Sequence, residues 1–379
     1  MAKIFVCGDV VNMFSSNMFV DEKLRALINS ADYAIANLEG CEYSGSGTVP
    51  KMMQFPGTMS ILKDSGFNLL LMANNHIADY GENALRYTLA EASRLGLQSI
   101  GAALNYDDAY KPVIIDIHGL KIGFFNLCEA HPHYYHSRSQ KYGYAWIGDP
   151  SLKTRINEIG LCTDKIVAFI HGGLEHCTCP LGFIRDFYHW LCDCGVNVVM
   201  GGHPHIPQGI ERYDDNLICY SLGNFFFPRH PESNSSDIEN HSFSIILDID
   251  KSSTEYEIIY HKMDNLITEL EDKERFPLRV EELSKILSLD EYGRIHAETI
   301  KKYYEELVSN LYHISLNTMR EDDTFAHRLK CSIRYILSPH YNNVDKQLRN
   351  KSFVHLINNE TYRYIVNEYL KDSYAREYE

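Results

Sequence analysis

Acidic, amide and imidazole side chains stand directly after short apolar segments of this chain. The clusters are Gly8-Asp9, Asn37-Leu38-Glu39, Asn74-Asn75-His76, His171-Gly172-Gly173 and Gly201-Gly202-His203-Pro204-His205. Carboxylates, imidazoles and a side-chain amide are donors that hold divalent cations of the zinc, manganese and iron type. The residue types therefore predict a metal site, provided that the fold brings the five clusters together.

Each residue taken alone has an ordinary structural explanation. An Asp after a strand is more often a turn residue, Asn74 or Asn75 would serve as a helix cap, and a single His is more often an interior or surface residue. The combination changes this balance, because gathering carboxylates and imidazoles at one place is unfavourable unless a cation neutralises them. We therefore favour metal binding over coincidence.

The segments that must position these clusters read as buried strands. Mainly apolar runs of four to six residues predict strands at about residues 4–7, 33–37, 68–72, 113–117, 122–127, 166–170 and 196–200. A helical pattern over residues 82–95 lies between two of them, with Gly96 as its stop. Strands alternating with helices predict an α/β sheet, and ligands bind at the carboxyl edge of such sheets.

Two hairpin patterns argue against a purely parallel sheet. Residues 113–127 turn at His118-Gly119, and residues 243–260 turn near Lys251-Ser252-Ser253. A mixed sheet, or two sheets packed together, fits better. After about residue 262 helical periodicity takes over, so we expect one domain at residues 1–265 and a helical C-terminal region at 266–379.

Composition narrows the classes of partner. The 379 residues are 45% hydrophobic and 23% charged, as in an ordinary globular protein, and the net charge of −15 argues against nucleic-acid binding. The first apolar run is too short for a secretory signal, and no apolar stretch is long enough to span a membrane, so we expect a cytoplasmic protein. Ten irregularly spaced cysteines do not suggest a disulfide framework. The sequence does not indicate an oligomeric state.

Longer motifs around the same clusters resemble a known family. Leu71 to Gly81 contains an ANNHxxDxG signature, Gly201 to Glu211 reads GxHPHxxQxxE, and Tyr220 to Phe225 reads YSLGNF. Together with Gly8-Asp9, Asn37-Leu-Glu39 and His171-x-Gly-x-Glu175, they extend over about residues 3 to 227 in order. The chain thus resembles the CapA family of poly-γ-glutamate capsule synthesis, which is related in fold to the calcineurin-type metallophosphoesterases.

This resemblance implies a four-layer α/β/β/α sandwich with a two-metal site at one edge. In the family pattern Asp9 and His205 bind a first metal, Glu39 bridges, and a second metal is bound by the side chains Asn75, His171 and His203. His76 would act on the substrate as a catalytic residue, with Asp79 orienting its ring. The neighbouring candidates for substrate contact are Asn74, Glu175, His176 and Asn224.

The chain also departs from the pattern. Val11 stands where the superfamily usually has a His, so the first metal loses one ligand and the site holds one or two ions. Glu39 replaces the usual Asp, and Gly172 and His176 replace aromatic residues, with His176 as a possible additional ligand. These departures change the wall of the pocket more than the metal site. They therefore affect which substrate fits more than they affect metal binding.

Three functions remain open at this point. The first is hydrolysis of a phosphoester in a small-molecule or polymeric anion, by water activated on manganese, iron or zinc, with His76 protonating the leaving oxygen. The second is a non-catalytic, metal-stabilised component of capsule polymer assembly or its regulation. The third is a metal-dependent hydrolase of γ-glutamyl amides. A substrate screen separates the first from the third.

Overall fold

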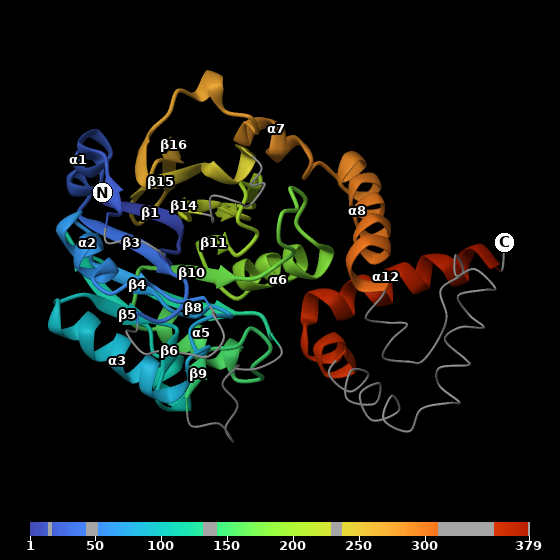
Figure 1. Ribbon diagram of the computed structural model, residues 1–379, viewed down its shortest axis with the longest axis horizontal. Helices are drawn as coiled ribbons and strands as arrows, with labels where there is room; N and C mark the ends of the chain where they lie inside the picture. Colours follow the sequence, from blue (N-terminus) through green and yellow to red (C-terminus); the bar gives the residue numbers. More distant parts are fainter. Residues whose placement is uncertain (14–16, 43–51, 132–141, 229–236, 310–351, 378–379) are drawn as a thin grey trace. The chain divides into compact units, whose positions relative to one another are not determined.

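The structure is a computed structural model that describes residues 1–13, 17–42, 52–131, 142–228, 237–309 and 352–377 (Figure 1). The chain divides into two compact units. Unit 1 contains residues 1–129 and 134–292, and unit 2 contains residues 130–133 and 293–379. All the predicted site residues belong to unit 1.

Unit 1 contains a nine-stranded mixed sheet, called sheet one here. Its strand order is β2-β17-β16-β15-β1-β3-β4-β5, with β14 paired to β1. The strands are β1 (Ala2–Val10), β2 (Phe19–Val20), β3 (Tyr33–Leu38), β4 (Leu69–Leu71), β5 (Gln98–Ile100), β14 (Asn224–Phe226), β15 (His241–Ile249), β16 (Thr254–Asp264) and β17 (Ile267–Leu270). β1, β3, β4 and β5 pair in parallel, whereas β15 pairs antiparallel with both β1 and β16.

A second sheet of six strands, sheet two, has the order β12-β13-β11-β10-β8-β7. Its strands are β7 (Val113–Ile117), β8 (Leu120–Cys128), β10 (Lys165–His171), β11 (Val198–Gly202), β12 (Ile210–Tyr213) and β13 (Asn216–Cys219). A separate short pair joins β6 (Ala102–Ala103) to β9 (Gly143–Tyr144). Both predicted hairpins are confirmed, because β7 pairs antiparallel with β8 and β15 with β16.

The two sheets pack face to face through alternating side chains. In β1, Ile4 and Val6 enter the core between the sheets, where Phe124 and Phe169 of sheet two meet them. Phe5 of the same strand points the other way, into a core beneath the outer helices. This period of two makes each sheet apolar on both faces, as a sheet covered on both sides requires.

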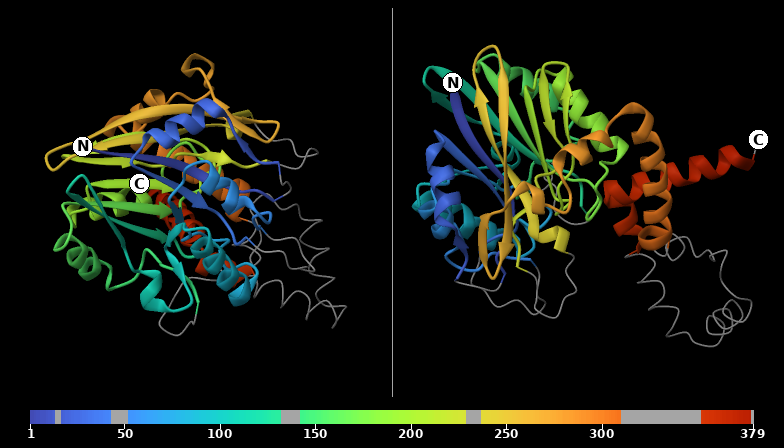
Figure 2. Two further views of the ribbon diagram at one scale, coloured as in Figure 1. Left: turned by 90° about the vertical axis from the view of Figure 1, so that its left-hand side faces the viewer. Right: turned by 90° about the horizontal axis from the view of Figure 1, so that it is seen from above.

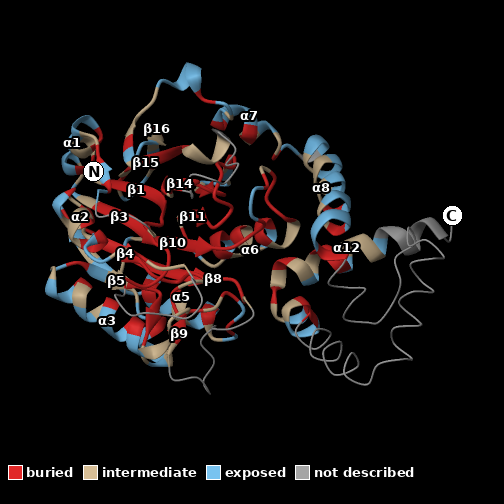
Figure 3. Cartoon of the chain, viewed as in Figure 1, coloured by how far each residue is buried: buried red, intermediate tan, exposed pale blue. Residues whose placement is uncertain are grey.

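Helices cover both outer faces. α1 (Glu22–Ser30), α2 (Thr58–Asp64) and α3 (Gly81–Arg94) pack on sheet one, while α5 (Leu152–Gly160) and α6 (Gly182–Asp193) pack on sheet two (Figures 1 and 2). Figure 3 shows the strands buried and the outward surfaces of the helices exposed. These layers confirm the expected α/β/β/α sandwich. The short helices α4 (Tyr106–Ala109), η1 (Asp237–Asn240), η2 (Lys273–Arg275) and α7 (Val280–Lys285) complete unit 1.

Unit 2 is helical in its described parts. α8 (Leu289–Tyr303) enters it and continues as a π-helical turn, η3 (Tyr304–Val308), and α12 (Glu360–Glu377) follows later. The rings of Tyr304 and Tyr369 stack at a centroid distance of 3.7 Å, which joins η3 to α12. The sequence also predicts helices over residues 324–337 and 344–370; the first lies outside the described residues, as does the start of the second.

The C-terminal helices are present, and the described chain before them contains further elements of unit 1. β17 and α7 lie after residue 265 and still belong to unit 1. The division between compact units therefore falls after Tyr292, and the predicted domain boundary after residue 265 stays a prediction. Within the described residues, no helix combines the length and apolar character that crossing a membrane requires.

Candidate metal centre

The predicted clusters meet where strands of both sheets end. Asp9 lies near the end of β1, Glu39 directly after β3, and His171 is the last residue of β10. The pairing of β1 with β3 shifts its register between Val6 and Asp9, and this irregularity sets Asp9 opposite Asn37 of β3. Irregularities of this kind re-aim side chains beside functional sites.

Asp9, Glu39 and His205 form the first group. One ligand atom from each lies within 4.8 Å of the others, and all three residues are buried. His205 Nδ1 is 3.4 Å from Asp9 Oδ2, and its Nε2 is 3.9 Å from Glu39 Oε1. These are the residues that the family pattern assigns to a first metal.

Glu39, His171 and His203 form a second group by the same criterion. His171 Nε2 is 3.7 Å from Glu39 Oε1 and 3.2 Å from His203 Nδ1. Asn75 Oδ1 is 2.9 Å from the same His171 Nε2, so the amide faces this group as well. Glu39 is common to both groups, as a bridging carboxylate must be.

The chemistry of Glu39 tests whether these residues suit a cation. Its side chain is fully buried, and neither carboxylate oxygen has a hydrogen-bond partner among the described residues. Burial raises the pKa of Glu39 to about 7, and the charge of Asp9 adds to this effect. A buried carboxylate without donors is strongly unfavourable unless a positive charge compensates it, so the donor set fits dications.

His205 shows the opposite electrostatic response. Burial alone would lower its pKa, but the negative charges of Glu39 and Asp9 outweigh burial and raise the pKa to about 10. In the metal-free protein an imidazolium at His205 therefore supplies part of the missing positive charge. Binding of a cation here must displace that proton.

His76 and Asp79 lie at the open side of the centre. His76 Nδ1 is 2.9 Å from Asp79 Oδ2, and His76 Nε2 is 4.0 Å from Glu39 Oε1. Burial opposes protonation of His76, whereas Asp79 and Glu39 favour it, and the net effect raises its pKa. The ring is thus held by an acidic partner with Nε2 directed towards the bridging carboxylate. Its catalytic role stays a prediction.

The four predicted substrate contacts divide into two kinds. Asn74 and Asn224 are buried: Asn74 bonds to the backbone at Gly40, His76 and Leu38, and Asn224 Oδ1 lies 2.9 Å from His205 Nδ1. Both amides hold other parts of the centre in place. Glu175 and His176 have side chains 50% and 42% exposed, so they reach the open rim. Contact with substrate stays a prediction for all four.

Glu175 also lies against two of the predicted metal ligands, His203 and His205. Its Oε1 is 4.0 Å from His203 Nε2, and it forms a third acidic and imidazole group with His203 and His205. His176 Nδ1 is 3.2 Å from Glu239 Oε1 of η1. Glu239 lies beside the rim, and no sequence motif around it indicated this position.

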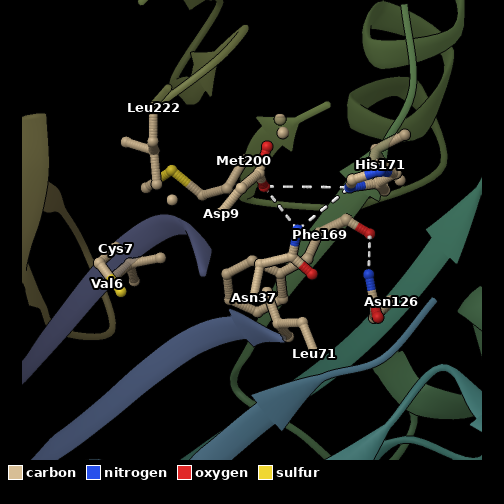
Figure 4. Close-up of a pocket in the computed structure, with 14 residues that line it drawn as sticks. Val6, Cys7, Asp9, Asn37, Leu71, Asn126, Phe169, His171, Met200 and Leu222 are labelled. Carbon is tan, nitrogen blue, oxygen red and sulfur yellow. Dashed lines mark hydrogen bonds and ion pairs between the residues drawn. The ribbon is translucent and has the colours of Figure 1, made fainter. Parts of the chain in front are cut away.

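Asn37 is a buried site residue that sequence reasoning placed in a cluster without giving it a role. Its Nδ2 is 2.6 Å from Asp9 Oδ1 and 3.1 Å from His171 Nδ1 (Figure 4). It thus contacts one ligand of each group. Its place two residues before Glu39, in the cluster Asn37-Leu38-Glu39, was the signal that could have identified it.

The backbone around the histidines is unusual. His176, His203 and His205 adopt positive φ angles of 57°, 94° and 60°. Residues other than glycine rarely do so, and each costs of order 1–3 kcal/mol. Hydrogen bonds from Gly172 N to Gly202 O and from His176 N to Pro204 O fix the two loops in this conformation.

The departures from the family pattern can also be located. Val11 is fully buried, with its N–H donated to Phe226 O at 2.7 Å, so it supplies no metal ligand. A side chain at Gly172 would meet Glu129, whose Oε2 lies 3.1 Å from the position of a Cβ. Glu129 is buried and accepts a hydrogen bond from Gly173 N. It occupies the space beside Gly172 on this side of the site.

Solved structures share the arrangement only loosely. A 5'-nucleotidase precursor from Thermus thermophilus is 12% identical with a TM-score of 0.42, and the alignment covers 81% of this chain and 60% of that one. Vps29 of Chaetomium thermophilum is 10% identical with a TM-score of 0.30, covering 72% of this chain and all of that one. Scores at this level carry no argument about the present chain.

Relatives found by sequence are more similar to this chain than these two structures are. The PGA biosynthesis protein CapA of Bacillus subtilis is 27% identical over 54% of this chain and 55% of its own length. The capsule biosynthesis protein CapA of Bacillus anthracis is 24% identical over 58% and 56%, and a probable polyglutamine synthesis accessory protein of Mycobacterium tuberculosis is 27% identical over 53% and 57%. The match spans about half the length of these relatives. Residues 3–229, more than half of the chain, match the family described as bacterial capsule synthesis protein PGA_cap, and the chain belongs to that family.

Proposed function

We propose that this protein is a metal-dependent hydrolase acting on an anionic substrate at the centre between the two sheets. The observation that supports it most strongly is Glu39, a buried carboxylate without hydrogen-bond donors that belongs to two potential ligand groups. Asp9 and His205 would hold one dication, and His171, His203 and Asn75 the other. A bound pair would supply Lewis-acid charge and lower the pKa of a water molecule.

The remaining chemistry belongs to side chains of the chain itself. Asp79 holds His76 Nδ1, and this contact orients Nε2 towards the centre and favours the protonated ring. A protonated His76 is suited to donate a proton to the leaving oxygen of a phosphoester. Glu175 and His176, which are partly exposed, would then meet the substrate at the rim. Manganese, iron and zinc all suit this mixed oxygen and nitrogen ligand set.

A second function is favoured by the names of the sequence relatives. These names describe capsule or PGA biosynthesis and an accessory protein, and none describes a hydrolysed bond. A non-catalytic, metal-stabilised component of polymer assembly would use the same ligands without turnover. A γ-glutamyl amide hydrolase would use them on a different bond.

One experiment separates these functions. The purified protein is assayed for metal content, then loaded with manganese, iron or zinc and tested on phosphomonoester, phosphodiester and γ-glutamyl amide substrates. Turnover of a phosphoester, together with one or two metal ions per chain, supports the proposal. Cleavage restricted to amides selects the third function, and a loaded protein without any turnover selects the assembly role. A protein that binds no dication refutes all three.

A further inference from the structure

Gln54 is a fully buried amide that contacts the ends of both strands that lead to Asp9 and Glu39. Its Nε2 donates to Val10 O at 2.7 Å and to Glu39 O at 2.5 Å, and its Oε1 accepts from Asn12 N at 2.9 Å. Both carbonyl oxygens face the amide nitrogen and an N–H faces the amide oxygen, so the reverse orientation would set oxygen against oxygen. The amide is therefore fixed by its three backbone partners.

Gln54 also connects the two segments beyond their own pairing. The register of β1 with β3 ends at Val10, whose carbonyl oxygen accepts from Glu39 N at 3.1 Å. Past this point the backbone N of Gln54 donates to Cys41 O at 2.8 Å, while its side chain holds Asn12 N. One residue thus links the chain after β1 to the chain after β3.

The backbone of Glu39 is held, whereas its carboxylate is not. Neither carboxylate oxygen has a hydrogen-bond partner among the described residues. The backbone is bonded from two sides: Gln54 donates to Glu39 O, and the Asn74 side chain bonds to Leu38 O at 2.8 Å and to Gly40 N at 3.1 Å. Because the main chain fixes the position of this residue, the lone pairs of its carboxylate stay available to a cation.

A link between the two strand ends also opposes electrostatic repulsion. Asp9 and Glu39 are buried carboxylates that share one potential ligand group, and like charges at close range repel. Asp9 directly precedes Val10, so the two bonds from Gln54 Nε2 reach the backbone of one carboxylate residue and the immediate neighbour of the other. Ligands that are held in place before binding bind more tightly, because less freedom is lost when the ion arrives.

We infer that Gln54 is a positioning residue that sets the separation of Asp9 and Glu39 and thereby strengthens cation binding at the position they share with His205. It acts through the two carbonyl groups that it bonds, rather than on the ion itself. This inference rests on the metal centre of the proposed function.

Calorimetric titration of Mn²⁺ into folded protein tests this role. Gln54→Met keeps an unbranched side chain of similar length but removes the three side-chain bonds, and it should weaken Mn²⁺ binding about 10–100-fold, as loss of a group that orients a ligand does. Thr88→Val is the matched control. Thr88 is also fully buried and donates to Glu42 O at 3.1 Å, in the segment that follows Glu39, but it belongs to none of the ligand groups among the described residues. This variant should bind Mn²⁺ as the wild type does.

Urea unfolding in chelator separates positioning from a purely structural role. Both variants should lose stability, because each removes a buried hydrogen bond, but only Gln54→Met should also lose Mn²⁺ affinity in the folded state. Equal affinity of Gln54→Met and wild type overturns the role of Gln54 and leaves the metal centre standing, and so does an equal loss of affinity in both variants. A wild-type protein that binds no Mn²⁺ overturns the metal centre and this inference together.

Hydrogen exchange of the wild type decides the question if Gln54→Met does not fold. In chelator the backbone amides of Asn12 and Glu39, which bond to Gln54 Oε1 and Val10 O, should already exchange slowly, because the link exists before an ion binds. Mass spectrometry of peptides that contain these residues measures the exchange. Fast exchange that slows only after Mn²⁺ is added would show that the ion orders the two strand ends, and it overturns the inference.

Discussion

Replacing Glu39 with glutamine should stabilise the metal-free protein and destabilise the metal-loaded one. The structure places this carboxylate in a fully buried site without hydrogen-bond donors, and burial raises its pKa from 4.5 to about 7. A group whose pKa is raised on folding contributes stability below its unfolded value and loses it as the pH rises through the folded value. At pH 8 the ionised Glu39 therefore opposes folding.

The size of the effect follows from the two pKa values. The difference between 4.5 and about 7 corresponds to about 3 kcal/mol at pH 8, which Glu39→Gln should regain in the absence of metal. Dications at about 100 times their dissociation constants stabilise by about 2.7 kcal/mol per site, hence by about 5 kcal/mol for two sites. The wild type should thus be less stable than the variant in chelator and more stable by about 2 kcal/mol in saturating Mn²⁺.

Urea unfolding at pH 8, in chelator and in Mn²⁺, measures this reversal. Glu42→Gln is the matched control: Glu42 is also buried, but its two oxygens accept hydrogen bonds from Gly57 N and Met59 N. Burial also raises the pKa of Glu42, although these two donors oppose the shift. Whatever its stability in chelator, that variant should keep the wild-type response to Mn²⁺, because Glu42 is in none of the ligand groups among the described residues. If Glu39→Gln is less stable than the wild type in chelator, the argument from an uncompensated carboxylate is wrong.

Three further changes probe other parts of the molecule. His76→Ala should lower turnover of a phosphoester about 10²–10⁴-fold while metal content stays that of the wild type; unchanged turnover would exclude the proton-donor role. His261 is fully buried and its pKa is lowered to about 3, mainly by burial, so its contribution to stability is present above pH 6.5 and falls as the pH drops towards 3. Between pH 7 and 5 the unfolding free energy of the wild type should therefore fall by about 2 kcal/mol more than that of His261→Gln. Denaturant titrations at the two pH values measure these free energies, and an equal fall in both proteins would contradict the argument. Gly8→Ala would set a Cβ 1.9 Å from Gly223 O and should lower the melting temperature and weaken Mn²⁺ binding, whereas Gly160→Ala, with its nearest neighbour at 3.7 Å, should do neither.

The sequence predicted the strands that carry the site because their local signals agree. β1, β3, β4, β10 and β11 each combine an apolar run with a polar cluster at the end, and each lies within a few residues of its expected range. Burial on both faces favours such runs, so no tertiary information is needed to find them. The prediction of four layers came from the family resemblance. The alternation of Ile4 and Val6 with Phe5 explains these layers physically, because it makes β1 apolar on both faces.

The parts that the sequence did not predict depend on contacts between distant segments. β14 and β17 are short strands, recruited into sheet one by β1 and β16, and nothing in their own residues distinguishes them from loops. The contact between the Asn37 amide and His171 likewise joins residues that lie 134 positions apart in the chain. Local patterns carry no information about such pairs.

The proposed ligands of the centre come from both sheets, and this determines at which stage of folding a cation could bind. Asp9 is made early in synthesis, whereas His203 and His205 emerge about half a chain later and meet it only once β11 has docked against the rest. Contacts this far apart in sequence form late in folding, because a long loop must first be closed. If the proposed centre binds a cation, the ion therefore enters a pocket that folding has already assembled, rather than acting as a template for the nascent chain.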